Sequence, residues 1–262
     1  MQTEKVIEHI VGWLKSYAEN ANCKGFVIGV SGGIDSAVTS TLCAKTGLNL
    51  LCLEMPIHQG KSQVTRADNH IDWLMENFPN VSRQPVDLTP VFDSLVDAFP
   101  KVQDEEERLM SLANTRARLR MTTLYYFAAL KGYLVAGTGN KVEDFGVGFY
   151  TKYGDGGVDL SPIADLVKTE VYELGKVLGI HQDIMEAPPT DGLWGDSRTD
   201  EDQIGASYPE LEWAMEMDDK GKTAADFSGR EKEVFMIYKR YNTANKHKMV
   251  PIPICEIPSN LK

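Results

Sequence analysis

Short apolar segments alternate with segments of helical periodicity along most of the chain. The first apolar segment, residues 26–30, is rich in β-branched residues, as expected for a strand buried on both faces of a parallel sheet. Further strands are expected at residues 49–55, 83–87, 133–136 and 160–164. This order predicts an α/β fold: a doubly wound, mainly five-stranded parallel sheet flanked by helices, with residues 1–262 forming one domain.

Amphipathic patterns predict the helices. Residues 1–14 place apolar side chains at helical spacing among charges and lack the uncharged core of a signal peptide. Residues 89–107 are expected to form a solvated connection or a short helix start, and residues 247–258 an extended proline-rich tail. The remaining helices are expected at about residues 62–77, 106–131, 166–178, 208–217 and 231–242.

Composition and charge exclude several classes of protein. No segment approaches the roughly 18 apolar residues of a membrane span, so we predict a cytoplasmic protein that does not bind membranes. A net charge of −11 argues against a nucleic-acid-binding surface, and it requires any anionic ligand to be held by local cations, amides or metal. The four cysteines show no C-x-x-C spacing, and Cys43 and Cys52 are expected to be buried free thiols.

A glycine-rich turn follows the first strand and precedes a helix. Its sequence is Ser31-Gly32-Gly33-Ile34-Asp35-Ser36, which matches neither a P-loop nor a dinucleotide-binding fingerprint. The serines and the free amides of the helix start form a nest of donors that suits a phosphate or pyrophosphate. Asp35 fits such a nest if a cation separates it from the phosphates, which predicts a Mg²⁺ ligand. The alternative is a glycine-rich turn with Asp35 as a helix cap.

The helix expected at residues 106–131 carries arginines in unusual places. With about 100° per residue, Arg120 falls on the apolar face and Arg116 at its edge, whereas Asn114 and Arg118 lie on another side. An arginine on a core face must meet an anion. For Arg120 this is either a nucleotide phosphate or a buried carboxylate, and Arg118 is expected to meet a second ligand or a subunit partner.

Two glycine-rich segments, residues 137–144 and 149–159, follow a predicted strand end and carry acids, lysine and hydroxyl groups. Such a composition favours function over a structural loop. Glu143 is expected to join Asp35 as a second Mg²⁺ carboxylate, because both follow the carboxyl ends of strands in one sheet. Lys168 opposes the dipole of its own helix, which suits contact with a polyphosphate; the alternative is a solvated lysine. Residues 188–202 are interpreted as a mobile acidic loop that orders when ligand binds.

The turn at residues 31–36 resembles the pyrophosphate loop of the N-type ATP pyrophosphatases, and nearly the whole chain resembles NAD⁺ synthetases. Further motifs carry this resemblance: Asn114 to Arg120, Gly137-Thr138 through Glu143, Phe149 to Gly157, the segment 189–208 and His247-Lys248. The resemblance implies a ligase that adenylates deamido-NAD⁺ with ATP, releases pyrophosphate and lets ammonia displace AMP. A GMP-synthetase-like ligase, a tRNA-modifying enzyme and a catalytically inactive nucleotide sensor are the alternatives.

The resemblance also implies roles for individual residues. Asp35 and Glu143 would hold the metal, and Asp35, Asp155, Lys168 and Lys248 would be catalytic. ATP would be bound by Ser31, Gly32, Gly33, Ile34, Asp35, Ser36, Arg120, Thr138, Lys168 and Thr190. Deamido-NAD⁺ would be bound by Asn114, Arg118, Lys152, Asp155, Asp159, His247 and Lys248.

Two further expectations concern partners, and one position departs from the family. Glutamine-using members carry a large amidohydrolase domain before the synthetase portion, and only 30 residues precede the pyrophosphate loop here, so free ammonia is the expected nitrogen donor and no glutaminase domain is predicted. The family implies a homodimer with deamido-NAD⁺ bound across its interface. Many bacterial members have an arginine where Glu54 precedes Met55-Pro56, so contacts to the ATP ribose are not carried over to this region.

Overall fold

The computed structural model describes residues 1–102, 104–190 and 199–262, without the side chains of residues 61–63 and 105–107. Its sheet is parallel and has the strand order β3-β2-β1-β4. The strands are β1 (Gly25–Gly29), β2 (Asn49–Glu54), β3 (Val81–Pro85) and the short β4 (Leu134–Val135). The α/β class and the parallel sheet are confirmed.

The expected fifth strand at residues 160–164 is reduced to an isolated bridge between Ala136 and Leu160, so the described part of the chain has four strands. Before this bridge, the side chain of Asp159 accepts the amide of Val135 at 2.8 Å, which occupies a donor that a longer ladder would use in that direction. Pro162 has no amide to donate. Pairing therefore stops after Leu160.

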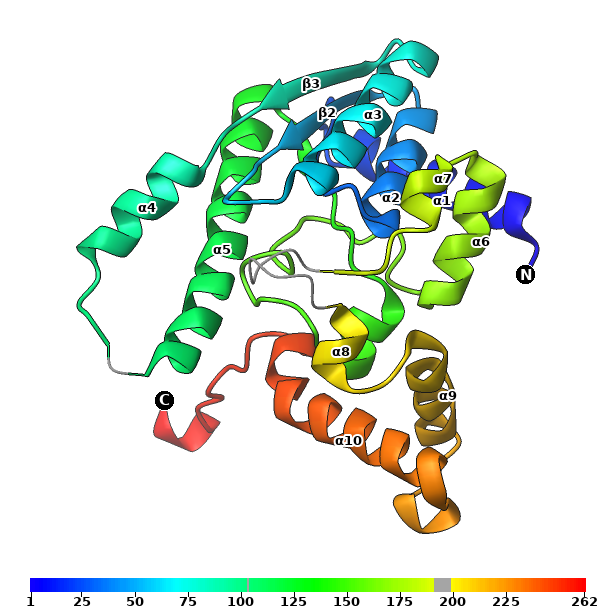
Figure 1. Ribbon diagram of the computed structural model, residues 1–262, viewed down its shortest axis with the longest axis vertical. Helices are drawn as coiled ribbons and strands as arrows, with labels where there is room; N and C mark the ends of the chain where they lie inside the picture. The colour runs from blue at the N-terminus through cyan, green and yellow to red at the C-terminus, as the bar shows by residue number, and fades with distance from the viewer. Residues whose placement is uncertain (103, 191–198) are drawn as a thin grey trace.

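Helices cover both faces of the sheet (Figure 1). On one face, α1, α2, α3 and α6 pack against Phe26 and Ile28 of β1; on the other, α4 and α5 pack near Val27. Adjacent residues of β1 thus enter opposite cores, as in a strand buried on both faces. The bounds are α1 (Thr3–Asn20), α2 (Ile34–Lys45), α3 (Lys61–Asn77), α4 (Thr89–Ala98), α5 (Glu105–Lys131) and α6 (Lys168–Leu178).

A third apolar core lies beyond the strand ends. It joins α9 (Tyr208–Asp219) and α10 (Gly229–Met249) to the π-helical segment η1 (Val142–Val147), which supplies Val142 and Val147. In Figure 1, α9 and α10 form the lower part of the molecule. The short helices are α7 (Gln182–Met185), α8 (Asp200–Ile204), η2 (Ala224–Asp226) and η3 (Ser259–Leu261).

Two expectations about helix extent are wrong. Residues 89–98 form the helix α4 rather than a solvated connection, because Phe92 of its apolar face is buried. The last long helix continues to Met249, so His247 and Lys248 lie in its final turn and not in an extended tail. Pro251 and Pro253 then prevent further helix, and residues 250–262 are exposed.

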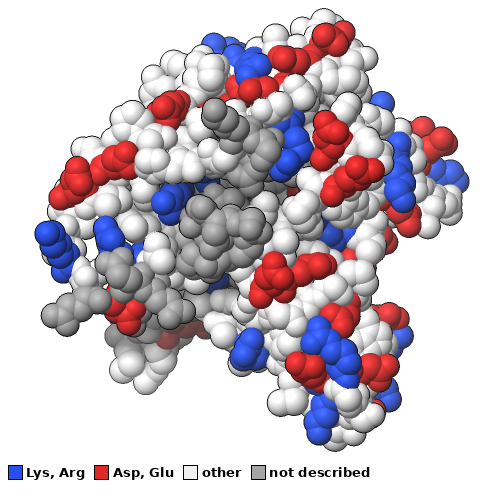
Figure 2. Space-filling model, viewed as in Figure 1, with Lys and Arg blue, Asp and Glu red and all other residues white. Residues whose placement is uncertain are grey.

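Of the predictions drawn from composition and charge, the one about the two buried cysteines is confirmed. Cys43 and Cys52 are buried free thiols, and burial raises the pKa of Cys52 to about 12. In the part of the chain that is described, no helix is both long and apolar enough to span a membrane. On the face shown in Figure 2, lysines and arginines are interspersed with acidic side chains among the coloured residues. The absence of nucleic-acid binding remains a prediction.

His70 fills a buried position between α2 and α3, where its Nε2 lies 3.0 Å from the hydroxyl of Ser40. Burial lowers its pKa from 6.5 to about 4. Because the unfolded chain binds this proton more readily, the free energy of unfolding should fall as the pH decreases from 6.5 to 4, by about 3 kcal/mol in total for this residue. Urea unfolding at pH 7 and pH 5 should show a smaller difference in His70→Gln than in the wild type.

The control is His9→Gln, since His9 is exposed on α1. This variant should keep the wild-type difference between the two pH values. If His70→Gln also kept it, His70 would not be the group that weakens the fold in acid.

Candidate functional site

A cleft opens at the carboxyl ends of β1, β2 and β4. This is the switch point of the sheet, because β2, which follows β1 in the chain, lies on one side of β1, whereas β4, which follows β3, lies on the other. Its walls come from the loop at residues 29–36, from α5, from residues 136–158 and from the segment 187–190. The predicted residues that line it are Ser31, Gly32, Gly33, Ile34, Asp35, Ser36, Arg120, Thr138, Glu143, Asp155, Lys168 and Thr190.

Hydrogen bonds to its own serine hydroxyl groups fix the conformation of the loop after β1. The amide of Ser31 donates to Ser36 Oγ at 3.2 Å, and Ser36 Oγ donates to the carbonyl of Gly33 at 3.0 Å. Gly32 has φ +79°, a conformation that favours glycine. Gly33 is the N-cap of α2 and makes no side-chain cap, so Asp35 lies inside the helix and the alternative of Asp35 as its cap is wrong.

Asp35 and Glu143 meet at one cation, Lys168. Lys168 Nζ lies 2.5 Å from Asp35 Oδ2 and 3.0 Å from Glu143 Oε1, and its side chain is only 4% exposed. This excludes the solvated lysine. It also places the two carboxylates that sequence spacing assigns to a metal within reach of one central atom. Their oxygen atoms are of the type that Mg²⁺ prefers, so this donor set fits the ion.

Burial and pairing act in opposite directions on these groups. Burial raises the pKa of Asp35 to about 6, and Lys168 opposes the increase. Burial also disfavours charge on Glu143, but Lys168 and a hydrogen bond from Tyr208 outweigh it and lower its pKa. For Lys168 the two carboxylates outweigh burial and raise the pKa. The lysine is therefore charged at neutral pH.

Two residues that hold these carboxylates were not assigned from the sequence. Asn140 is fully buried; its amide nitrogen donates to Asp35 at 3.4 Å, and its oxygen accepts the amide of Glu143 at 3.2 Å. The Tyr208 hydroxyl donates to Glu143 Oε1 at 2.6 Å. Glu143 itself lies on the π-helical segment η1, a conformation found often at functional sites. Asn140 belongs to the sequence motif at residues 137–143, but no sequence pattern relates Tyr208 to Glu143.

Two more carboxylates line the same cleft. Burial raises the pKa of Asp144 to about 8, helped by the charges of Glu143 and Asp155. Burial likewise raises the pKa of Asp155 to about 6, although the amide of Thr151 donates to Asp155 at 2.9 Å and opposes this. The part of the cleft beside these two groups thus favours a cationic or protonated group over an anion, whereas residues 31–36 and Arg120 supply donors elsewhere in the cleft.

The two arginines of α5 that the helical wheel singled out behave differently. Arg120 lines the cleft, and its Nε donates to the carbonyl of Met55 at 3.0 Å. Arg116 lies instead over the ring of Phe92 on α4, 4.3 Å from its centroid. Arg120 is therefore the one of the pair that is placed to meet a ligand.

Five of the residues assigned to deamido-NAD⁺ do not line the cleft, but hydrogen bonds that involve residues 148–152, which adjoin it, connect them with one another. Thr151 Oγ1 donates to Asn114 at 2.6 Å, and Arg118 donates to the carbonyl of Lys152 at 3.4 Å. Lys152 Nζ in turn donates to the carbonyl of His247 at 2.8 Å. Lys248 Nζ donates to the carbonyls of Gly148 and Tyr150, each at 2.8 Å. Segments far apart in sequence therefore meet here.

Asp159 and Glu54 are engaged elsewhere. Asp159 does not line the cleft; its carboxylate accepts the Val135 amide and, at 3.0 Å, the hydroxyl of Tyr125. Both Nε and Nη2 of Arg83 donate to the carboxylate of Glu54, at 2.5 and 2.6 Å. Arg83 also contacts Asp68. Glu54 thus belongs to a network between β2, β3 and α3. Residues 191–198 of the predicted mobile loop lie outside the described residues.

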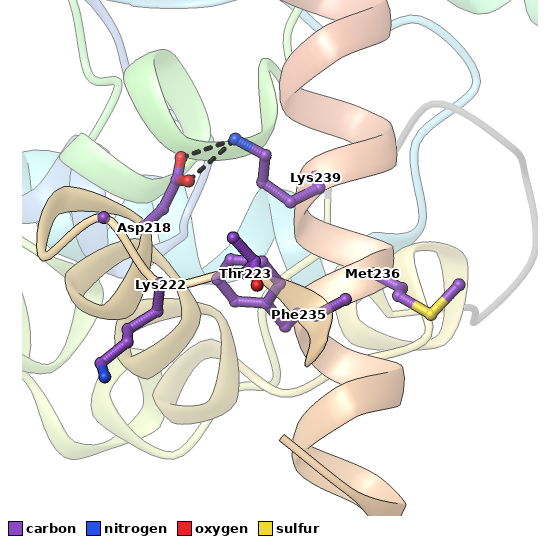
Figure 3. Close-up of a pocket in the computed structure, with 8 residues that line it drawn as sticks. Asp218, Lys222, Thr223, Phe235, Met236 and Lys239 are labelled. Atoms are coloured by element: carbon purple, nitrogen blue, oxygen red, sulfur yellow. Dashed lines mark hydrogen bonds and ion pairs between the residues drawn. The ribbon is translucent and has the colours of Figure 1, made fainter. Parts of the chain in front are cut away.

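A second pocket lies between α9 and α10 (Figure 3). Its Lys239 extends from α10 to Asp218, with both carboxylate oxygens at 2.8 and 3.0 Å, and Phe235 forms part of its wall. The charged pair is satisfied internally. The cleft at the strand ends holds converging acids, cations and backbone donors, and it is the candidate active site.

Comparison with known proteins agrees with this geometry. A family model for NAD synthase matches residues 6–251. The chain belongs to the NAD synthase family. An NH(3)-dependent NAD(+) synthetase of Finegoldia magna is 41% identical over 213 residues, which cover 81% of this chain and 84% of that relative. Two solved structures of similar proteins share the fold of this chain as well.

An NMN synthetase from Francisella tularensis superimposes with a TM-score of 0.82 at 30% identity and covers 99% of both chains. An NH3-dependent NAD synthetase from Campylobacter jejuni gives a TM-score of 0.78 at 27% identity and covers 98% of this chain and 100% of its own. The NAD synthase family accounts for the α/β fold and for a ligase activity that uses ATP.

Proposed function

We propose that this protein is an ammonia-dependent NAD⁺ synthetase that adenylates deamido-NAD⁺ with ATP and then amidates it. The observation that carries the proposal is the meeting of Asp35 and Glu143 at Lys168, directly beside the donor nest after β1. The NH(3)-dependent relatives support ammonia as the nitrogen donor. Nothing in the site favours a GMP-synthetase-like substrate.

In the first step a carboxylate oxygen of deamido-NAD⁺ attacks the α-phosphorus of ATP, and the bond to the β-phosphate breaks. The serines and glycines of residues 31–36 would bind the departing pyrophosphate through backbone and hydroxyl donors. Lys168 and Arg120 would offset the charge that two reacting anions bring together. Asp35 and Glu143 would hold Mg²⁺, which neutralises phosphate charge and orients the leaving group.

In the second step the nitrogen of ammonia attacks the carbonyl carbon of the adenylate, AMP leaves and one proton is lost from nitrogen. No protein nucleophile is needed. Asp155 lines the cleft, and burial raises its pKa to about 6, so it would be ionised at neutral pH and able to orient ammonium or accept its proton. Lys248, beside Tyr150, would face the same reacting centre.

The test is to mix the pure protein with ATP, Mg²⁺, ammonium and deamido-NAD⁺ and to measure NAD⁺, AMP and pyrophosphate. We expect the three products in equal amounts. Nicotinate mononucleotide and xanthylate are run in parallel, because one structural relative is an NMN synthetase. Product from either of these, with none from deamido-NAD⁺, would reject the proposed acceptor.

We also propose a homodimer and a cytoplasmic location. Exposed apolar side chains on α5 support the dimer: Leu109, Met110, Tyr126 and Leu130 are 43 to 63% exposed. Burial of such side chains stabilises association. Sedimentation equilibrium should give twice the 29.1 kDa chain mass, and Tyr126→Glu combined with Leu130→Glu should shift the protein toward monomer. A monomeric wild type at the concentrations used for assays would contradict this.

A further inference from the structure

Arg66 of α3 reaches across to the loop after β1. Its Nε donates to the carbonyl of Gly32 at 3.2 Å, 34 residues earlier in the chain. The side chain is partly buried and lines the cleft together with the loop. A single hydrogen bond thus fixes the guanidinium beside the proposed pyrophosphate nest, while its terminal amino groups have no partner within the described part of the chain.

The other cations near this loop are held differently. Lys168 is paired with both Asp35 and Glu143, and the arginine expected before Met55 is replaced by Glu54. Arg83 is bound to that glutamate. Arg66 has no carboxylate partner among the residues that the structure describes. It is therefore a cation beside the nest whose charge is not already compensated by an acid.

We propose that Arg66 binds the pyrophosphate part of ATP and the pyrophosphate that leaves; this rests on the proposed function. A guanidinium presents donors in a planar fork that matches phosphate oxygens. When the bond between the α- and β-phosphates breaks, negative charge increases on the β-phosphate. A cation already fixed beside that group stabilises the leaving group without reorganising.

The test compares Arg66→Ala and Arg66→Lys with the wild type in calorimetric titrations with Mg²⁺-pyrophosphate and, separately, with AMP. Arg66→Ala should weaken pyrophosphate binding about 10- to 100-fold, as expected for lost hydrogen bonds to a charged group, and leave AMP binding within about twofold. Arg66→Lys should lie between, because it keeps the charge and loses the fork. Arg240→Ala, an exposed arginine on α10, is the control and should change neither.

The alternative is that Arg66 only supports the loop through Gly32. Arg66→Gln, which keeps a donor for the Gly32 carbonyl without the charge, would then bind pyrophosphate as the wild type does, and that result, or a change in pyrophosphate binding below twofold in Arg66→Ala, would overturn the proposal. If Arg66→Ala does not fold, Arg66→Gln keeps a donor without the charge, and the same selective loss is expected. If the wild type makes no NAD⁺ but Arg66→Ala still binds pyrophosphate selectively more weakly than the wild type, the proposed acceptor is rejected and the role of Arg66 is kept.

Discussion

Replacement of Asp35 by asparagine is expected to reduce NAD⁺ formation by at least about 100-fold while the protein stays folded. The substitution keeps the shape of the side chain and removes the charge that faces Lys168 and, in the proposed mechanism, Mg²⁺. Burial already raises the pKa of Asp35 to about 6, so a neutral side chain at this place costs the fold little. Product formation and thermal unfolding are measured on the same preparation.

Asp165→Asn is the matched control for this variant. Asp165 is also paired with a lysine, Lys141, at 3.1 Å, but its side chain is 98% exposed. An exposed pair contributes little to stability, so this variant should keep both activity and melting temperature. Activity of Asp35→Asn close to that of the wild type would remove Asp35 from the metal site.

The parts of the site that follow strand ends could be predicted from the sequence. In a parallel sheet the carboxyl ends of β1 and β4 meet at one edge, so Asp35 and Glu143 converge because of topology alone. The donor nest of residues 31–36 depends on local hydrogen bonds between near neighbours. Such local and topological features are encoded in short sequence patterns.

Features that depend on long-range contacts were not predicted. The bond from Tyr208 to Glu143 joins residues 65 positions apart, and the approach of Arg66 to Gly32 depends on how α3 packs on the sheet. The prediction of a fifth strand was wrong for a related reason: an apolar segment predicts a strand, but Pro162 lacks the amide that would extend pairing beyond Leu160, and the side chain of Asp159 occupies the Val135 amide before the bridge. Hydrophobic pattern does not report which donor a polar side chain will occupy.

The sequence also explained only in part why Lys168 occupies an electrostatically unfavourable position. Lys168 is the first residue of α6, where the helix dipole opposes its charge. A polyphosphate partner was expected there. The structure shows that two protein carboxylates already stabilise the charge in the free protein. The lysine therefore has a structural role before any nucleotide binds, and this makes its removal informative.

Lys168→Met is expected to abolish adenylation and to destabilise the protein without Mg²⁺. Breaking a buried ion pair by removing one partner costs about 3–5 kcal/mol, because Asp35 and Glu143 would face each other without a cation. Mg²⁺ should offset part of this cost, since the two carboxylates become available to it. The melting temperature of the variant should thus rise more with Mg²⁺ than that of the wild type.

The control is Lys141→Met, which removes a lysine from the exposed pair with Asp165 and should show neither the loss nor the response to Mg²⁺. A second comparison is the double variant Asp35→Asn with Lys168→Met. It leaves one carboxylate instead of two, so it should recover stability without Mg²⁺ and lose most of the response to the ion. If Lys168→Met were as stable as the wild type without Mg²⁺, the two carboxylates would not depend on Lys168 for their charge. If the double variant responded to Mg²⁺ as strongly as Lys168→Met, the ion would be stabilising the protein from somewhere other than the Asp35–Glu143 pair.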